Sequence, residues 1–174
     1  MQVGGSLGHI GIAIAKKYPK IKVVVQDIAV AVEQGRSQLD PSLQSRVSFM
    51  EHDFFQTNPV KNAGVYFFSR ILHDWPDDKA ITILRRVVDA MGPHSKIIIC
   101  EKIVPPPDTI HPWHERTMRR YDLVMMLLNG FERSMEQWKK LVKDTDDRLA
   151  ITRVERPKGS LASLIEVSWV KPSL

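Results

Sequence analysis

Short apolar runs alternate with amphipathic stretches along most of the chain. The runs at 23–25, 65–69 and 97–99 are rich in β-branched and aromatic residues and lack polar alternation, which is typical of strands covered on both faces of a parallel sheet. Residues 77–90 instead carry apolar positions at helical spacing, with two acidic residues at the start. This alternation predicts an α/β fold with an open, mostly parallel sheet and helices on both faces.

The last third of the chain has a different pattern. Two strand-like runs end the sequence, and the residues Pro157-Lys-Gly159-Ser between them favour an antiparallel hairpin. Ser134 and Gln137 have the spacing of a capping box. We expect a mobile, proline-rich loop over 104–116. The remaining predicted elements are helices over 10–15, 29–38, 117–128 and 135–143 and strands over 47–52, 149–155 and 164–170.

Composition narrows the class of protein. The chain has 174 residues, of which 43% are hydrophobic and 26% are charged, as expected for one globular domain. Cys100 is the single cysteine, so an internal disulfide is excluded and a reducing, cytoplasmic location is expected. No apolar run approaches the roughly 18 residues that span a bilayer, and the first residues do not resemble a signal peptide. We therefore expect no membrane partner.

The charge balance does not indicate a nucleic-acid partner. Lys and Arg number 25 against 20 Asp and Glu, a net charge of +5. The basic residues occur as separate pairs inside helical patterns, not as one run interleaved with aromatic residues. These pairs are Lys16-Lys17, Arg85-Arg86, Arg119-Arg120 and Lys139-Lys140.

A glycine-rich turn follows the first residues. Val3-Gly4-Gly5-Ser6-Leu7-Gly8 precedes a predicted helix, and Asp27 lies 19 residues after Gly8 at the end of the next strand. Glycines let the backbone approach a nucleotide closely, and a carboxylate at the second strand can accept both ribose hydroxyls. Adenosine, nicotinamide and flavin ligands all fit this pattern.

Several motifs in order narrow the choice. They are Gly4-Gly5-Ser-Leu-Gly8, Gln26-Asp27-Ile28, His52-Asp53-Phe54-Phe55, Arg70-Ile-Leu-His73-Asp74-Trp75-Pro76-Asp77-Asp78 and Gly130-Phe-Glu132-Arg133-Ser134. Together they resemble the plant and fungal S-adenosylmethionine-dependent O-methyltransferases of the caffeate, flavonoid and polyketide type, with the fungal branch closer, over essentially the whole chain. The resemblance implies a Rossmann-like methyltransferase fold, S-adenosylmethionine as cofactor with S-adenosylhomocysteine as product, and a small hydroxylated aromatic or polyketide-like acceptor from secondary metabolism.

The resemblance also assigns residues to the cofactor. Asp27 would hold the ribose, Asp53 and Phe54 would flank the adenine, and Trp75 would cover its face. Ser69 stands where the family often has a lysine that contacts the cofactor. Asp27 and Asp53 could instead be ordinary strand-end carboxylates, and Trp75 could be core. The predicted cofactor-binding residues are Gly4, Gly5, Gly8, Asp27, Asp53, Phe54, Ser69 and Trp75.

For the chemistry, the resemblance implies a histidine general base flanked by two acids. His73 follows a strand whose end faces the ligand crevice of an α/β sheet. Glu101 and Glu132 occupy the positions of the two acids, which would fix the tautomer of His73. Asp74 is assigned no catalytic role. No metal site is expected, because His111 and His114 lie in the proline-rich loop with no third ligand nearby.

The acceptor pocket of the family is lined by positions that correspond here to Met118, Asp122, Met125, Met126 and Phe131. Methionine side chains are adaptable and suit a flat aromatic acceptor. On a helix, however, Met125 and Met126 could equally belong to the core.

Two departures from the family stand at the start of the chain. Only residues 1–3 precede Gly4, so the first strand is expected to be truncated, with Gln2 in place of an acidic residue. Ser6 replaces a glycine found in many members. We expect residues 1–174 to form the catalytic domain only, without the N-terminal helical domain through which full-length members form homodimers.

Two alternatives to an active O-methyltransferase remain. One is a catalytically inactive, truncated remnant that binds adenosyl ligands or a protein partner. A nicotinamide-dependent oxidoreductase is the other, although the chain has no recognisable Tyr-x-x-x-Lys pair.

Overall fold

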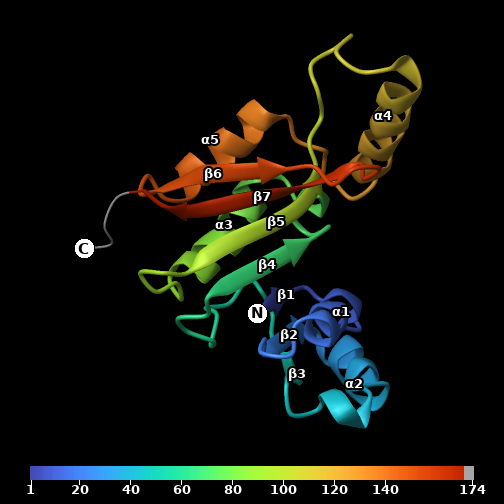
Figure 1. Cartoon of the computed structure of the whole chain (residues 1–174). Helices are drawn as coiled ribbons and strands as arrows, with labels where there is room; N and C mark the ends of the chain where they lie inside the picture. The colour runs from blue at the N-terminus through green and yellow to red at the C-terminus, as the bar shows by residue number, and fades with distance from the viewer. Residues whose placement is uncertain (171–174) are drawn as a thin grey trace.

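A computed structural model of the chain describes residues 1–170 and has one seven-stranded sheet flanked by helices (Figure 1). The strands are β1 (Gln2–Val3), β2 (Val23–Asp27), β3 (Val47–Glu51), β4 (Val65–Ser69), β5 (Lys96–Lys102), β6 (Leu149–Glu155) and β7 (Ala162–Trp169). The helices are α1 (His9–Lys17), α2 (Ala29–Ser37), α3 (Asp77–Val88), α4 (Pro112–Met126) and α5 (Met135–Thr145). The predicted α/β class is confirmed.

The strand order places a ligand crevice beside β1. The order is β3-β2-β1-β4-β5-β7-β6, in which the first five strands are parallel and β7 runs antiparallel between β5 and β6. The order therefore reverses between β1 and β4, and such a switch point leaves a crevice at the carboxyl ends of the two strands. The predicted C-terminal hairpin is confirmed as β6 and β7. Gln2 and Val3 pair with both β2 and β4, so the two-residue β1 is central in the sheet.

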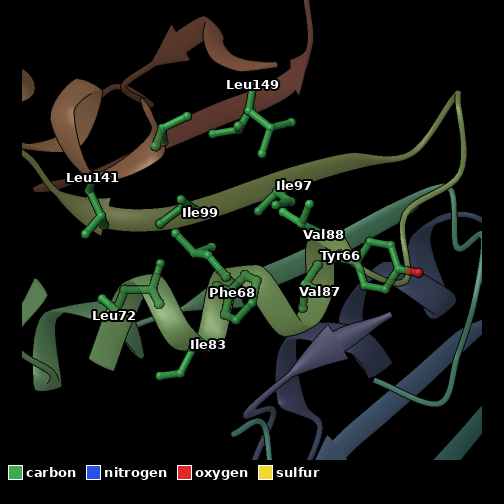
Figure 2. Packing of buried hydrophobic residues seen from close by; sticks show 14 of the residues in the cluster. Tyr66, Phe68, Leu72, Ile83, Val87, Val88, Ile97, Ile99, Leu141 and Leu149 are labelled. Atoms are coloured by element: carbon green, nitrogen blue, oxygen red, sulfur yellow. The ribbon is translucent and has the colours of Figure 1, made fainter. Parts of the chain in front are cut away.

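Apolar side chains of the strands form two clusters with the flanking helices. The larger one packs β4, β5 and β7 against α3 and α5, with fully buried Tyr66, Phe68 and Ile99 at its centre (Figure 2). A smaller cluster packs α1 and α2 against β2 and β3. Burying apolar area of this extent is the main favourable contribution to folding, and it holds the strand ends that carry the site.

Helix α4 is longer at its start than the sequence predicted. The expected loop over 104–116 is wrong beyond 111, because Pro112 is the first residue of the helix and His111 caps it by accepting a hydrogen bond from the Trp113 amide at 3.2 Å. Proline is favoured at this position, since its missing N–H would be unpaired anyway. Figure 1 shows α4 standing away from the sheet. The capping box of Ser134 and Gln137 at the start of α5 is confirmed.

Among residues 1–170, no helix has both the length and the apolar composition needed to cross a membrane.

Candidate active site

The glycine-rich turn forms one wall of the crevice. Gly4, Ser6 and Gly8 have left-handed backbone conformations, with φ of 63°, 48° and 77°. Asp27 at the end of β2 pins the turn, because its Oδ2 accepts a hydrogen bond from the Ser6 amide at 2.7 Å and its Oδ1 accepts one from the Ile28 amide at 2.8 Å. The carboxylate that was expected to contact a ribose therefore also holds the turn in place.

Glycine is required in this turn for space as well as conformation. A Cβ on Gly4 would lie 2.5 Å from Cδ1 of Ile71, and one on Gly8 would lie 2.9 Å from the Phe49 ring. Both distances are too short for carbon atoms. The side-chain amide oxygen of Gln2 accepts a hydrogen bond from the Gly11 amide at 3.0 Å, so the turn is also tied to α1.

The opposite wall is the loop after β4, which carries His73. Arg70 begins the loop with a φ of 55°, and a short 3-10 helix, Leu72–Asp74, follows. Oε1 of Glu101, at the end of β5, accepts hydrogen bonds from the amides of Ile71 and Leu72 at 2.8 and 3.1 Å. Because Glu101 is buried in the interior strand β5, these bonds fix the loop relative to the sheet.

The two glutamates named from the sequence converge on one nitrogen of His73. Nδ1 of the imidazole lies 3.2 Å from Oε1 of Glu132 and 3.5 Å from Oε2 of Glu101. A carboxylate is an acceptor, so the two contacts favour a hydrogen on Nδ1, the tautomer that leaves the lone pair of neutral His73 on Nε2. Asp74 lies on that side, with Oδ1 at 3.4 Å from Nε2. Lys102 places Nζ 2.9 Å from Oε1 of Glu132.

Nearby charges and burial act in opposite directions on the pKa of His73. Burial alone would lower its pKa, but the hydrogen bond with Glu132 and the negative charges of Glu101, Glu132 and Asp74 outweigh burial, and the pKa of His73 is raised.

The pKa values of Glu101 and Glu132 are shifted in opposite directions. Burial raises the pKa of Glu101 in spite of the nearby His73 and the two backbone donors. Burial would also raise the pKa of Glu132, but the hydrogen bonds from His73 and Lys102 lower it below its usual value. Glu132 is therefore the more firmly ionised of the pair.

A buried arginine connects the Glu132 segment to the His73 loop. The Arg133 side chain is fully buried, and it donates hydrogen bonds to the backbone oxygens of Leu72 at 2.7 Å and Trp75 at 2.8 Å and to Oδ1 of Asp77. Next to it, the Phe131 amide donates to the backbone oxygen of His73 at 2.9 Å. These bonds hold the two segments in register although they are far apart in sequence.

A cavity of about 840 Å³ lies between the two walls, a size typical of small-molecule sites. It is lined by Gln2, Gly4, Gly5, Ser6, His9, Ile10, Asp27, Ser69, Arg70, Ile71, His73, Glu101, Lys102, Tyr121, Val124, Met125, Leu161 and Ala162. The structure thus brings five of the predicted cofactor and acceptor residues to the cavity, together with two of the predicted acid–base groups. These are Gly4, Gly5, Asp27, Ser69 and Met125, with His73 and Glu101.

Other predicted cofactor residues lie just outside the cavity lining. Gly8 packs against β2 and β3. Asp53 accepts a hydrogen bond from the Phe55 amide at 2.9 Å. Phe54 and Trp75 form an edge-to-face aromatic group with Phe55, with ring centres 4.9 to 6.0 Å apart, and this group packs against the larger apolar cluster.

Apart from Met125, which lines the cavity, the predicted acceptor residues lie in three other environments. Met118 is buried and Met126 is exposed, and neither is part of the cavity lining. Asp122 and Phe131 line a second cavity of about 610 Å³, together with Glu132. There, Oδ1 of Asp122 accepts a hydrogen bond from the Glu132 amide at 2.8 Å.

Sequence reasoning missed Lys102, Tyr121 and Leu161. Lys102 directly follows Glu101 in a strand, where neighbouring side chains point to opposite faces, but it is the last residue of β5 and reaches the site all the same. Leu161 lies in the loop between β6 and β7, and no local sequence signal places that loop at the cavity.

Within the described part of the chain, His73, Glu101 and Glu132 are the group whose ligand atoms lie close enough to share a metal ion, within 4.8 Å of one another. Lys102 already supplies a positive charge to Glu132. We therefore interpret the group as an acid–base site.

A turn of glycines at a switch point, a strand-end carboxylate and a histidine between carboxylates define a nucleotide-cofactor site with a proton-transfer group. Comparison with known families agrees with this class. Residues 1–146 match the family model described as the O-methyltransferase domain, and the chain belongs to that family.

Curated relatives are fungal. The chain is 48% identical over 169 residues to the "Hps1-dma1 cluster O-methyltransferase" of Dothistroma septosporum, a match that covers 97% of this chain and 39% of the relative. It is 40% identical over 170 residues to "O-methyltransferase fsr2" of Gibberella fujikuroi, covering 95% of this chain and 44% of the relative. The chain thus spans about two fifths of the length of these relatives.

Solved structures share the fold. LepI in complex with SAM has a TM-score of 0.85 and 28% identity, covering 97% of this chain and 42% of that one. A structure described as "A Pericyclic Reaction enzyme" has a TM-score of 0.84 and 28% identity, again covering 97% of this chain and 42% of that one. The O-methyltransferase NcsB1, in complex with S-adenosylmethionine and 2-hydroxy-5-methyl naphthoic acid, has a TM-score of 0.82 and 26% identity. The match covers 97% of this chain and 48% of NcsB1.

Proposed function

We propose that this chain is the catalytic domain of an O-methyltransferase that moves a methyl group from S-adenosylmethionine to a hydroxyl of a small aromatic or polyketide-like metabolite, with His73 as general base. The observation that carries the proposal is the position of His73 on the wall of the cavity opposite the glycine turn, with Nδ1 against Glu132. Family membership and the S-adenosylmethionine complex of NcsB1 support the cofactor.

The residues present fit the cofactor. Gly4, Gly5 and Asp27 line the cavity. Each Asp27 oxygen accepts one backbone hydrogen bond, which leaves lone pairs for ribose hydroxyls. S-adenosylmethionine, when bound, supplies a methyl group activated by a sulfonium. We further propose that Asp53, Phe54 and Trp75 flank its adenine.

The chain itself would handle the proton. With Nδ1–H donated to Glu132, Nε2 of His73 is the nitrogen that takes the hydroxyl proton as the oxygen attacks the methyl group. Glu101 fixes the loop that carries His73 through the amides of Ile71 and Leu72. Holding the acceptor in line contributes more than the base, since positioning can supply roughly 7 to 11 kcal/mol.

Residues outside this chain are proposed to complete the acceptor pocket. Several apolar side chains of α4 and the turn after it are largely exposed: Leu123, Val124, Met126, Leu127 and Leu128. We propose that residues 1–174 form the catalytic domain and that a helical domain of the full-length protein covers this face and pairs two copies.

The proposal is tested by binding and turnover. Calorimetry with S-adenosylhomocysteine should show binding to the wild-type chain and weaker binding to Asp27→Asn. Full-length protein is then incubated with S-adenosylmethionine and a panel of phenols, and methylated products are detected by mass spectrometry.

In that assay, His73→Gln should lower the rate by about 10²–10⁴-fold, whereas the exposed His94→Gln serves as control and should not. Activity should survive EDTA, since no metal is invoked. A folded chain that does not bind S-adenosylhomocysteine would favour the inactive remnant, and full activity in His73→Gln would refute the general base.

A further inference from the structure

Lys102, the last residue of β5, brings an ammonium group into the His73 cluster. Its Nζ lies 2.9 Å from Oε1 of Glu132, and the same oxygen lies 3.2 Å from Nδ1 of His73. One carboxylate oxygen is therefore shared by an ammonium and an imidazole. The Lys102 side chain is only 12% exposed, and Nζ lies 3.9 Å from the centre of the Tyr121 ring. The ammonium is thus held from two sides.

The surroundings of His73 create a problem for a general base. Glu132 and Glu101 face Nδ1, and Asp74 faces Nε2. Each negative charge favours the protonated imidazole, and an imidazolium cannot accept a proton from a hydroxyl. A base in this position needs a nearby positive charge that opposes protonation.

Lys102 is placed to supply that charge. Arg133 donates its hydrogen bonds to backbone oxygens and Asp77 and reaches Glu101 and Glu132 only through longer-range attraction. Arg70 acts on Asp74. Among the described residues, Lys102 is the one cation that forms an ion pair with a carboxylate in contact with Nδ1. The charged and titratable groups around His73 are Arg70, Asp74, Glu101, Lys102, Tyr121, Glu132 and Arg133.

We propose that Lys102 is a positioning residue of the site: by holding Oε1 of Glu132 it weakens the grip of that carboxylate on His73 and lowers the pH at which the imidazole becomes a free base. The catalytic meaning of this role rests on the proposed function. The charge relation itself is a property of the chain and is measurable without turnover.

The experiment is an NMR titration of chains labelled with ¹⁵N-histidine, in which His73→Gln identifies the His73 signals. Two atoms that share one oxygen at 2.9 and 3.2 Å interact strongly enough that Lys102→Met should raise the titration midpoint of His73 by roughly 1–2 pH units. Lys102→Arg retains the charge and should keep the midpoint within about 0.5 unit of wild type. Lys96→Met, an exposed lysine of the same strand, is the matched control and should cause no shift.

Two variants keep the test decisive. If Lys102→Met does not fold, Lys102→Gln removes the charge while keeping an amide donor, and the same upward shift is expected. A folded, uncharged variant whose His73 midpoint is unchanged or lower would overturn the proposal.

Turnover gives a separate readout. In full-length enzyme, Lys102→Met should move the acidic limb of the pH–rate profile upward by the same amount, and Lys102→Arg should restore it. An NMR shift without any methyl transfer by the wild type would support the role of Lys102 and count against the proposed function. Methyl transfer with an unshifted pH profile in Lys102→Met would overturn the role and leave the function standing.

Discussion

Replacing Arg133 by methionine tests how the site is held together. The wild-type guanidinium is fully buried and donates to the backbone oxygens of Leu72 and Trp75, and it stacks 4.4 Å from the centre of the Phe131 ring. Methionine fills similar space but donates nothing, so the Trp75 oxygen loses its donor and the Leu72 oxygen keeps only the Trp75 amide, at 3.3 Å.

The expected cost follows from these contacts. The Trp75 oxygen left without a partner costs about 1–3 kcal/mol, and the lost cation–π contact adds about 0.5–2 kcal/mol. Removing a buried charge returns part of its desolvation cost. Asp77 is about half exposed, so its lost ion pair adds little. We expect Arg133→Met to lower the free energy of unfolding by about 2–4 kcal/mol, a substantial share of the 5–15 kcal/mol typical of a domain.

Urea unfolding followed by circular dichroism measures this difference. Arg133→Lys keeps the charge but cannot serve three acceptors in a fixed fork, and it should lie between wild type and Arg133→Met. Arg119→Met removes an exposed arginine paired with Glu115 and should change the unfolding free energy by less than about 0.5 kcal/mol. A value for Arg133→Met within that same margin would refute the reasoning.

Further outcomes are expected at three other positions. Gly130→Ala would place a Cβ 2.1 Å from the backbone oxygen of His73 and 2.7 Å from the carbonyl carbon of Asp74; since main-chain atoms cannot step aside, stability should fall by about 1–3 kcal/mol and methyl transfer at least about tenfold. Gly64→Ala, whose Cβ would meet no atom within 4 Å, is its control, and equal melting temperatures for the two variants would contradict the clash. Ser6→Gly should raise the unfolding free energy by up to about 1 kcal/mol, because serine has a φ of 48°; a lower value in thermal unfolding would show that the turn is unstrained. Because the pKa of His73 is raised in the folded state, its protonation stabilises the fold below the unfolded value of about 6.5, and this contribution is lost as pH rises through the folded pKa. The difference in unfolding free energy between wild type and His73→Gln should therefore be larger at acidic than at alkaline pH, and a difference that grows toward alkaline pH would contradict this sign.

Most of the fold could be predicted from local pattern. The run at 65–69, apolar up to Ser69, became β4 with the expected bounds, because a strand covered on both faces carries few polar residues. The predicted helix begins at 117, later than the observed α4, because Pro112 is the first residue of the helix and not part of a loop. Proline is common both in loops and at the first position of a helix, and only the cap formed by His111 distinguishes the two cases.

The site was less accessible to sequence reasoning. His73, Glu101 and Glu132 were named from the resemblance to a family, and nothing in their spacing shows that residues 59 positions apart share a hydrogen bond. Arg133 illustrates the limit, because arginine is rarely buried and its three acceptors lie in a loop about 60 residues earlier. Contacts of this range are fixed by the sheet topology.

The hairpin of β6 and β7 determines which part of the cavity lining is free to change. Because β7 pairs with β5 from Ile97 to Lys102, the strand that carries Glu101 and Lys102 is shielded from changes at the sheet edge. The loop that joins β6 and β7 nevertheless brings Leu161 to the cavity. Exchanges within residues 156–161 should therefore reshape this cavity, while Glu101, Lys102 and the His73 loop stay where they are.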